Sequence, residues 1–375
     1  MQGGTMRSMN DLSEAAEQWS EVYANSGIKL PIMTYDHVKL WYECFAESDH
    51  IRVFKAMEGK QIIGYLPMII KVRKGVRVLT NQANYHCQYG EALVRSGHEE
   101  IFKRKILEEI LKEKGWDVLH NVFDYSFSGI YPLFPESLLA NVKRRWKMNI
   151  QPTYTVVLDK SCDEYFQKNL SANMRKSLKL KKNRLKKAGP HSYLHFEGDA
   201  AVGKWQEFLR IEDSGWKGRD GTSILKTEPE YRKYYEELIR NLSSTKDLHL
   251  YFLELNQKYI AAVFGYTAGD VFQYLKIGYD EEYQALSPSH LLFMFLMEDI
   301  QQHHKEIKRI HLFPYDDAGY KIRFANEEQH YAEIILYNNT IRGRMLYALQ
   351  RMKRQIAKHP KLARHIKRIF SAGKS

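Results

Sequence analysis

A short segment in the last third of the chain has the residue types of an anion-binding turn. Residues 278–292 read Gly-Tyr-Asp-Glu-Glu-Tyr-Gln-Ala-Leu-Ser-Pro-Ser-His-Leu-Leu. Ser287 is a favourable helix N-cap, and Pro288, at the first helical position, has no N–H to lose. A helix that begins here would offer free backbone N–H groups and a positive dipole end to an anion. A cofactor pyrophosphate is the natural candidate, although most Ser-Pro helix starts only cap a helix.

The flanking segments place this turn between a sheet and a helix. Three apolar runs upstream, separated by Asn-Gln-Lys and Gly-Asp, predict an antiparallel meander: 248–255, 259–268 and 271–279. Downstream the pattern predicts a helix, a strand, a short helix and a last strand, in this order: 291–304, 307–313, 317–326 and 331–337. The turn therefore joins the last strand of the meander to the helix.

The first half of the chain shows the same order of elements more faintly. Its composition predicts five strands and one helix, namely strands at 49–57, 61–71, 76–79, 116–123 and 148–158 and a helix at 99–114. Residues 81–90 open no clean helix, so we predict no second phosphate turn. A chain of 375 residues is expected to form two domains.

The order meander, turn, helix, strand resembles the GNAT acyltransferase superfamily, whose members bind acyl-CoA at a Gln/Arg-x-x-Gly-x-Gly/Ala turn. Gln284 matches the first position of that turn, and Ser287 and Ser289 occupy its glycine positions. The resemblance is closer to the GNAT-like proteins of cellulose and exopolysaccharide biosynthesis, which are related to the Fem peptidyl transferases. It covers roughly 185–337 and rests on three elements: Leu286-Ser287-Pro288-Ser289, Trp216-Lys217 and Gly319–Phe324.

This resemblance implies an α+β fold of tandem GNAT-like domains, each a mixed, mostly antiparallel sheet flanked by helices. The implied units are an N-terminal GNAT-like domain, a basic helical connector, a C-terminal acyltransferase domain and a basic amphipathic tail: 1–158, 159–188, 189–340 and 341–375. The first domain, which lacks a phosphate turn, is expected to help form the acceptor groove.

The resemblance also implies acetyl-CoA or another acyl-CoA as the donor. The pantetheine arm would lie beside the predicted strand 271–279, with its phosphates over the start of the next helix. The residues expected to bind the cofactor are Ile277, Gln284, Leu286, Ser287, Pro288, Ser289, His290 and Leu291. No metal is expected.

Acyl transfer needs an N–H donor for the thioester oxygen, a base for the acceptor and an acid for the departing thiolate. By position, the backbone of Ile277 or Lys276 would supply the N–H. Glu212, expected beside an aromatic residue, is the candidate base, and Tyr320 is the candidate acid. Two carboxylates are alternatives to the base: Asp213 and Asp280. The acceptor, which the resemblance implies to be an amine or hydroxyl of a sugar or cell-envelope precursor, would meet Trp216, Lys217, Tyr274, Tyr279 and Lys321.

The net charge of +12 is concentrated in two segments. No acidic residue follows Glu333, whereas 342–374 hold eleven basic residues, so that 1–333 carry 46 basic against 45 acidic groups. A second block, 175–187, has eight basic residues in thirteen. Leu178 and Leu185 lie one heptad apart in it and predict a thin apolar seam on a cationic helix. This connector helix, predicted over 162–188, is either a solvated bridge or a phosphate-contacting helix beside the substrate groove.

The C-terminal segment also has the spacing of an amphipathic helix. Its apolar residues recur at helical intervals among arginines and lysines: Ile341, Met345, Leu349, Met352 and Ile356. We expect 341–352 to dock on the second domain and 354–370 to meet an anionic membrane face or another polyanion.

Composition excludes several classes of protein. Hydrophobic residues make up 44% of the chain, which is enough for packed cores. The cysteines, Cys44, Cys87 and Cys162, are far apart and predict reduced, buried thiols. His303-His304 is predicted to be an exposed helix end and not a metal pair, because adjacent helical residues face different directions. Residues 1–20 lack the apolar core of a signal peptide, and a cytoplasmic location is expected, with peripheral binding at the inner membrane face as an option.

Two other functions fit the same sequence. The basic block at 175–187 also suits a Fem-type transferase that takes its aminoacyl group from tRNA, which predicts strongly salt-dependent binding. A non-catalytic scaffold at a membrane surface is a third reading, favoured by serine in place of glycine at Ser289.

Overall fold

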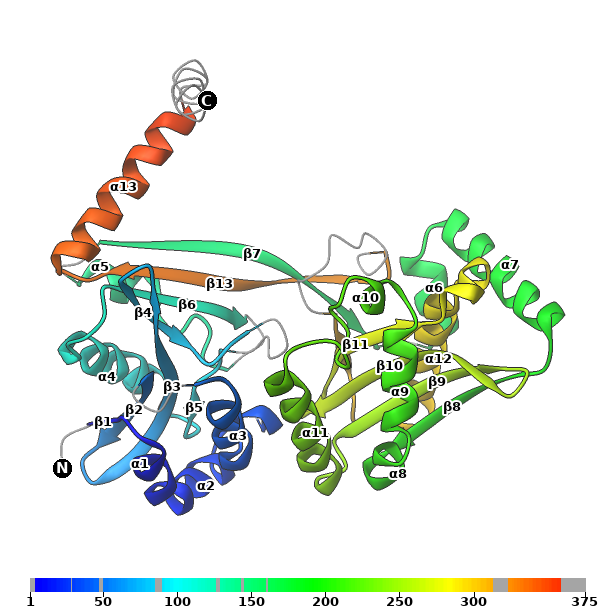
Figure 1. Cartoon of the computed structure of the whole chain (residues 1–375), viewed down its shortest axis with the longest axis horizontal. Coiled ribbons are helices and arrows are strands. Elements are labelled where there is room, and N and C mark those ends of the chain that lie inside the picture. The colour runs from blue at the N-terminus through cyan, green and yellow to red at the C-terminus, as the bar shows by residue number, and fades with distance from the viewer. Residues whose placement is uncertain are drawn as a thin grey trace.

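The computed structural model describes residues 4–27, 29–46, 50–84, 90–125, 129–142, 145–159, 161–312 and 323–358. Within these residues the chain forms two lobes joined by one 13-stranded mixed sheet (Figure 1). Two long strands, β7 (Arg145–Val157) and β13 (Glu327–Tyr337), run from one lobe to the other. The expected α+β class, with a mixed sheet flanked by helices, is confirmed.

In its described residues the N-terminal lobe contains the first six strands, five α-helices and the 3-10 segment η1 (Pro31–Met33). The strands are β1 (Gly4–Met6), β2 (Ile51–Glu58), β3 (Gln61–Arg73), β4 (Val76–Asn81), β5 (Leu93–Val94) and β6 (Val118–Tyr125). The helices are α1 (Met9–Glu14), α2 (Ala16–Ala24), α3 (Tyr35–Phe45), α4 (Glu99–Lys112) and α5 (Glu136–Ala140). Helices α1 to α3 were not predicted from the sequence.

The C-terminal lobe holds the predicted meander. Its strands are β8 (His191–Glu197), β9 (Leu248–Leu255), β10 (Lys258–Ala268), β11 (Val271–Tyr279) and β12 (Arg309–His311). Its helical elements are α6 (Cys162–Asn169), α7 (Ala172–Ala188), α8 (Gly198–Val202), α9 (Trp205–Asp213), α10 (Trp216–Arg219), α11 (Pro229–Ser244), the 3-10 segment η3 (Glu281–Leu286) and α12 (Pro288–His303). The sheet order is β12-β11-β10-β9-β8.

Both faces of this meander are covered by helices, which explains its continuous apolar sequence. Leu250 and Phe252 of β9 pack in the cluster that contains α9 and α11. Tyr251 and Leu253, which alternate with them, pack in the cluster that contains α12. A strand buried on both faces loses the apolar–polar alternation of a half-exposed strand.

The predicted connector helix is broken in two. Ser171 accepts a hydrogen bond from the N–H of Met174 at 3.2 Å and so caps the start of α7. Arg175 donates to the carbonyl oxygen of Gln167 at 2.8 Å and satisfies the end of α6. The buried residues of α7 are Leu178 and Leu185, which confirms the predicted apolar seam.

Strands β7 and β13 pair with each other along their length and tie the lobes together. The register runs from Glu327 opposite Thr155 to Tyr337 opposite Arg145. Residues 331–337 of β13 also pair with β6, whereas 155–157 of β7 pair with β12. The final strand thus completes the sheet of the first lobe. The domain limits expected from the sequence stay a prediction.

The lobes also meet through an aromatic contact between α3 and α11. The Phe45 ring lies 4.8 Å from the Tyr231 ring and 5.1 Å from the Tyr234 ring, between centroids. Tyr234 Oη is 3.3 Å from His37 Nε2, and both side chains are buried. One hydrophobic cluster accordingly continues from the first lobe into the second.

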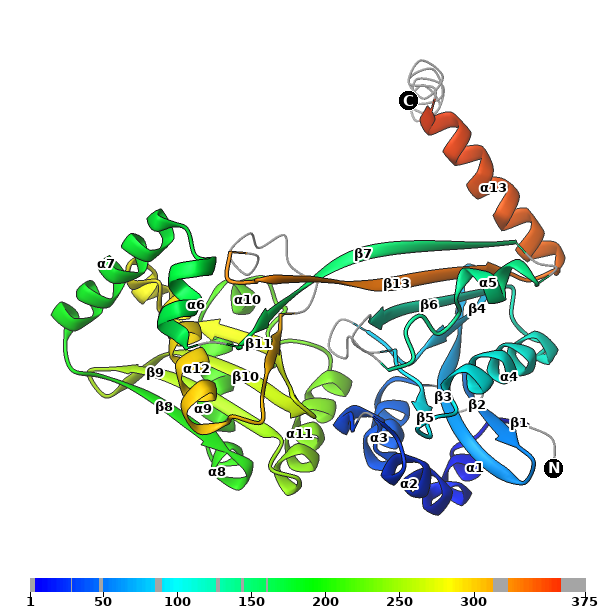
Figure 2. The same cartoon turned by 180° about the vertical axis from the view of Figure 1, so that it is seen from behind.

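Helix α13 (Ile341–Lys358) begins on the first lobe and extends away from it (Figures 1 and 2). Its apolar residues are exposed: Ile341 (88%), Met345 (54%), Leu349 (42%) and Met352 (53%). The expectation that 341–352 dock on the second domain is therefore wrong, because the helix starts from β13 on the other lobe. Among the described helices, none combines the length and apolarity needed to cross a bilayer. The rest of the tail lies outside the described residues.

Candidate active site

The edge of β11 is open over its second half. β11 pairs with β10 along its whole length but with β12 only at Val271, Phe272 and Gln273. From Tyr274 to Tyr279, the structure describes no strand on that side. An unpaired strand edge presents backbone N–H and C=O groups to any extended ligand that lies beside it.

A bulge marks the point where β11 leaves β12. Leu275 is an extra residue, because Lys276 pairs with Phe264 and Tyr274 pairs with Gly265. A bulge bends its strand and re-aims the backbone groups that follow it.

Hydrogen bonds identify which backbone groups face the open edge. The Asp280 N–H donates to the Ile260 carbonyl of β10 at 2.9 Å, so alternate residues back along β11 also face β10. The N–H and C=O of Ile277 therefore point to the open side. Lys217 Nζ donates to the Ile277 carbonyl at 2.8 Å, which agrees with this direction. Of the two predicted backbone donors, the geometry favours Ile277, since the N–H of Lys276 faces β10.

The turn after β11 leads into α12 with an uncapped first turn. Ser287 has φ 51° and ψ 56°, a left-handed conformation, and its side chain makes no capping hydrogen bond. The expectation that its hydroxyl caps the helix is wrong, because N-cap residues need extended backbone to reach the first-turn N–H groups. Pro288 has no N–H, and within the described chain Ser289 N–H has no backbone acceptor. The N–H groups of His290 and Leu291 donate to the Ser287 carbonyl, so the Ser289 N–H is the one that the first turn offers to an anion.

Positive side chains flank this mouth. Helix α7 contacts both η3 and α12. Burial, followed by the charges of Lys181 and Arg323, lowers the pKa of His290 to about 4. Burial and the charges of Arg323 and Arg184 also lower the pKa of Lys181. Cations that repel each other around a helix N-terminus form a favourable setting for a multiply charged anion.

A buried carboxylate lies on the other side of β11. Glu212, at the end of α9, has a relative exposure of 1%. Its Oε1 is 3.4 Å from Lys217 Nζ and 3.5 Å from Lys276 Nζ, and its Oε2 accepts the N–H of Ile224 at 2.8 Å. Burial lowers the pKa of Lys276 to about 8, although the charge of Glu212 opposes this effect.

Gly278 allows α9 to approach β11 closely enough to build this network. A Cβ at that position would lie 2.6 Å from Glu212 Cα and 2.8 Å from its backbone N. No side chain fits there, so glycine is required for the carboxylate to reach the lysines. The glycine at the end of the strand is thus explained by close packing.

The comparisons with known proteins agree with this geometry. Residues 172–322 match the family model described as acetyltransferase (GNAT) domain, a range that includes β11, the turn and α12. We call the segment 172–322 the GNAT domain after the family model that it matches. No curated protein matches the chain.

Solved structures extend the similarity of fold beyond the GNAT domain to both lobes. FemX has 12% identity and a TM-score of 0.54, covering 92% of this chain and 99% of its own. A conserved protein of unknown function from Bacteroides thetaiotaomicron has 14% identity and a TM-score of 0.51, covering 86% and 97%. The C-terminal domain of a lysylphosphatidylglycerol synthetase from Agrobacterium fabrum has 10% identity and a TM-score of 0.50, covering 92% and 96%. At these identities the likeness concerns the fold, and the class of the GNAT domain is acyltransferase.

The GNAT domain brings together most of the residues predicted for the donor. Gln284 is exposed on η3, Leu286, Ser289 and His290 are half-buried at the mouth, and Pro288 and Leu291 are buried beneath it. Ile277 lies on the open edge of β11, which η3 connects to the start of α12.

The residues predicted for the acceptor are placed less uniformly. Tyr274 is buried, and its ring packs edge-on against Phe293 at 5.3 Å, whereas Tyr279 is half-buried. Trp216 is 47% exposed, and its ring lies 6.0 Å from Lys217 Nζ. The neighbours of the Glu212 carboxylate are the two lysines. The other two predicted residues lie outside the described residues: Tyr320 and Lys321.

The alternative carboxylates are engaged elsewhere. Asp213 accepts a hydrogen bond from Ser223 at 2.5 Å, and Asp280 forms an ion pair with Lys258 at 2.8 Å. Neither reaches Lys276. Glu212 is therefore the carboxylate that the GNAT domain places beside β11.

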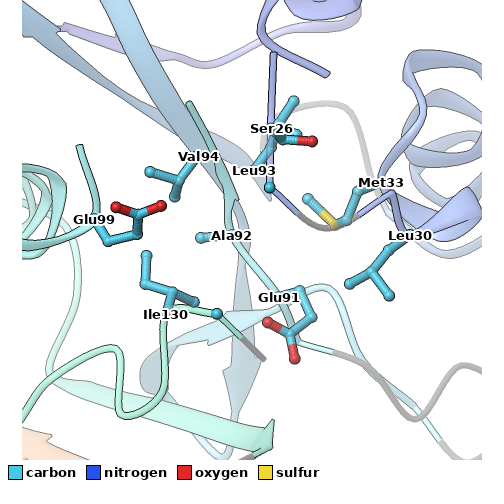
Figure 3. Close-up of a pocket in the computed structure, with 11 residues that line it drawn as sticks. Ser26, Leu30, Met33, Glu91, Ala92, Leu93, Val94, Glu99 and Ile130 are labelled. Carbon is cyan, nitrogen blue, oxygen red and sulfur yellow. The ribbon is translucent and has the colours of Figure 1, made fainter. Parts of the chain in front are cut away.

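Two cavities in the described residues lie away from the mouth. One, in the N-terminal lobe, is lined by Leu30, Met33, Leu93 and Ile130 with Glu91 and Glu99 at its sides (Figure 3). Its volume is about 50 Å³, room for a few water molecules and too little for a nucleotide. A groove of about 820 Å³ between α6 and the end of α12 is lined by four carboxylates and two lysines, which disfavours a diphosphate.

Lys181 and Arg323 were not among the predicted site residues. Lys181 belongs to the basic block recognised at 175–187, but the block alone does not show which lysine turns toward α12. Arg323 follows the predicted Tyr-Lys pair by two positions. Their placement near His290 depends on tertiary packing.

Proposed function

We propose that the protein is an acyl-CoA-dependent N- or O-acyltransferase whose donor lies along the open edge of β11. One observation carries this proposal: a strand edge that has no partner strand among the described residues runs into a helix N-terminus that has no side-chain cap and is flanked by cations. An extended pantetheine arm would pair with the edge, and the diphosphate would meet the Ser289 N–H. The acyl-transferase class of the GNAT domain supports this reading.

The residues around β11 suit the chemistry of acyl transfer. The Ile277 N–H would bind the thioester oxygen as negative charge develops on it, and Lys217, 2.8 Å from the Ile277 carbonyl, would add a positive charge there. The acceptor loses a proton as its bond to the acyl carbon forms and the C–S bond breaks. Lys276, with a pKa of about 8, and Glu212 form the pair that would receive this proton.

The remaining parts of the reaction rest on sequence resemblance. Tyr320 is our candidate for returning a proton to the thiolate, and Lys321 for contacting the acceptor. Acetyl is the acyl group we favour, and a sugar or cell-envelope polysaccharide precursor is the acceptor that the motif resemblance implies. The N-terminal lobe would supply one wall of the acceptor groove.

Ligand-dependent thermal unfolding tests the donor. Acetyl-CoA should raise the melting temperature of the full chain, because a ligand that binds only the native state stabilises it. Ser289→Asp should abolish this shift by placing a negative charge at the helix mouth, whereas Ser20→Asp, an exposed serine of α2, should leave it unchanged. A wild-type protein without a shift at millimolar acetyl-CoA, or an unchanged shift in the Ser289 variant, would refute the assignment.

The exposed basic residues of α7 favour a second candidate, an aminoacyl-tRNA donor. Lys186 and Lys187 are exposed on the helix that contacts η3. FemX, whose fold is similar, carries the name of the Fem-type transferases considered in this alternative. Binding of tRNA should weaken steeply with salt, and Lys186→Glu with Lys187→Glu should reduce the slope by about 2 if both contact phosphates. A steep slope without any acetyl-CoA shift would favour this candidate, and the absence of tRNA binding would exclude it.

Helix α13 supports a peripheral membrane location. Its apolar stripe is exposed at Ile341, Met345, Leu349 and Met352, and the sequence of the helix contains six basic residues and no acidic one. Each basic residue near an anionic surface contributes about 1 kcal/mol. The full chain should therefore sediment with phosphatidylglycerol vesicles and less with phosphatidylcholine vesicles, and Met345→Asp should reduce the bound fraction. Equal sedimentation with both lipids would contradict this role. A scaffold without chemistry would share this property but show no acetyl-CoA shift.

A further inference from the structure

Three histidines and one aspartate gather at the end of α12 that lies away from the candidate active site. His195 lies on β8 and His249 on β9, whereas Asp299 and His304 lie in the last turn and at the C-cap of α12. At 1.5 Å per residue, Asp299 is about 16 Å along the helix from its first residue. The cluster is therefore separate from the mouth of α12.

Three of these side chains place possible metal-ligand atoms close together. His195 Nδ1 is 3.2 Å from Asp299 Oδ2, and His304 Nε2 is 3.8 Å from the same oxygen. One ligand atom from each of the three lies within 4.8 Å of the others. Ligands at the usual zinc distances of about 2.0–2.1 Å lie roughly 3.3 Å apart in a tetrahedron, so a small inward movement would close the set on an ion.

Each of the three also has a further partner. His195 Nε2 lies 3.0 Å from His249 Nδ1, and His304 Nδ1 lies 3.5 Å from Glu306 Oε1. Tyr251 Oη donates at 3.1 Å to Asp299 Oδ2, the oxygen that faces both histidines. The Tyr251 ring stacks on the His195 ring at 4.2 Å and 6°. Metal-binding histidines ordinarily donate their second ring nitrogen to such a partner, which fixes the ring orientation.

Exposure suits an ion that enters from solvent. The side chains of His195, Asp299 and His304 are 13%, 10% and 15% exposed, and His249 lies beneath them with 3% residue exposure. With three protein ligands, a water molecule would supply the fourth ligand of a tetrahedral ion. Two imidazoles and one carboxylate form a donor set that zinc and its neighbours bind, while magnesium and calcium prefer oxygen alone.

We propose that His195, Asp299 and His304 form a binding site for a divalent transition-metal ion, with Zn²⁺ as the first candidate. The ion would fasten β8 to the end of α12. This role is independent of the acyl-CoA proposal, because none of the three residues contacts β11 or the helix mouth in the described contacts. Glu197, with His195 and His249, forms a second set of nearby ligand atoms. We favour the first set because each of its members has a supporting partner.

Metal binding to the full chain tests this site. After dialysis against a chelator, isothermal titration should show one Zn²⁺ per chain, and Co²⁺ should give the visible absorption of a four-coordinate ion. His304→Ala and Asp299→Asn should each weaken Zn²⁺ binding by at least about tenfold, and Glu306→Gln by about tenfold through the loss of its support. His303→Ala is the matched control, since this neighbouring histidine is exposed and outside the cluster.

The outcomes separate the alternatives. Circular dichroism of the metal-free variants shows whether they fold. If His304→Ala does not fold, Asp299→Asn, which preserves side-chain shape, is the variant that tests the site. Equal affinity in wild type and Asp299→Asn would overturn the proposal. Loss of binding in Glu197→Gln with retention in His304→Ala would also overturn it, in favour of the second set. Acetyl-CoA binding should persist in the chelator, so failure of either proposal leaves the other intact.

Discussion

Replacing Glu212 with glutamine should destabilise the protein, because two lysines would lose their shared counter-charge. The carboxylate has no exposed surface and lies 3.4 Å from Lys217 Nζ and 3.5 Å from Lys276 Nζ. One such pair is worth about 5 kcal/mol at an effective dielectric constant of about 20, before desolvation is counted. The lysine side chains are 19% and 13% exposed and can partly return to water. We therefore expect the free energy of unfolding to fall by about 3 kcal/mol, the lower end for breaking a buried pair.

Urea unfolding of the full chain at pH 7, followed by circular dichroism, measures this loss. Glutamine keeps an oxygen that can accept the Ile224 N–H, so wild type and variant both retain this hydrogen bond, which is 2.8 Å long in the wild type. Adding Lys276→Met to the Glu212→Gln variant should recover about half of the loss, because it removes a buried charge. A single variant as stable as wild type, or a double variant no more stable than the single, would refute the reasoning.

The pH dependence of stability gives the same pair a second test. Burial lowers the pKa of Lys276 from 10.5 to about 8 in the folded protein. Between these values the unfolded chain binds more protons than the folded one, so the free energy of unfolding should rise with pH over this window. Lys276→Met should flatten that rise. A profile unchanged by the substitution would show that Lys276 is not the titrating group.

Three further substitutions have definite expectations. Gly278→Ala should cost about 2–3 kcal/mol by forcing α9 away from β11, while Gly203→Ala, whose nearest neighbour would be 3.5 Å away, should change the melting temperature little. Burial raises the pKa of Asp124 from 3.8 to about 7, so its contribution to stability is present below pH 4 and is lost as pH rises through 7; Asp124→Asn should remove that slope from unfolding titrations. Ser287→Gly should raise the free energy of unfolding by about 1 kcal/mol by relieving the left-handed backbone, and a lower value in urea unfolding would contradict this.

The local elements of the GNAT domain were predictable because their patterns are strong. The meander at 248–279 follows from apolar runs separated by short turns, and the helix after Pro288 from its periodicity. Because the strand 271–279 leads directly into that helix, the sequence also indicated where the donor would bind. Each of these signals lies within about ten residues, and local signals of this kind are the ones that a sequence carries most clearly.

The features that depend on distant residues were not predictable. The left-handed backbone of Ser287 is set by the turn from η3, and residue types alone indicated an ordinary cap. Glu212 was expected beside an aromatic ring, but the approach of α9 over Gly278 places it between two lysines. His304 was expected to be exposed, whereas β8, a strand with no recognised signal, brings His195 against it. For Glu212 and His304 the deciding neighbour is more than sixty residues away, whereas for Ser287 it is the adjacent η3, an element that was not predicted.

The position of β13 makes the folding of the first lobe depend on a strand that is synthesised much later. Because this strand inserts between β6 and β7, the facing edges of these two strands stay open until residue 337 has emerged. Open edges of this kind recruit other strands and promote aggregation. The N-terminal half therefore stays incompletely folded until β13 has been synthesised, and a fragment that ends before β13 should require a chaperone or form aggregates.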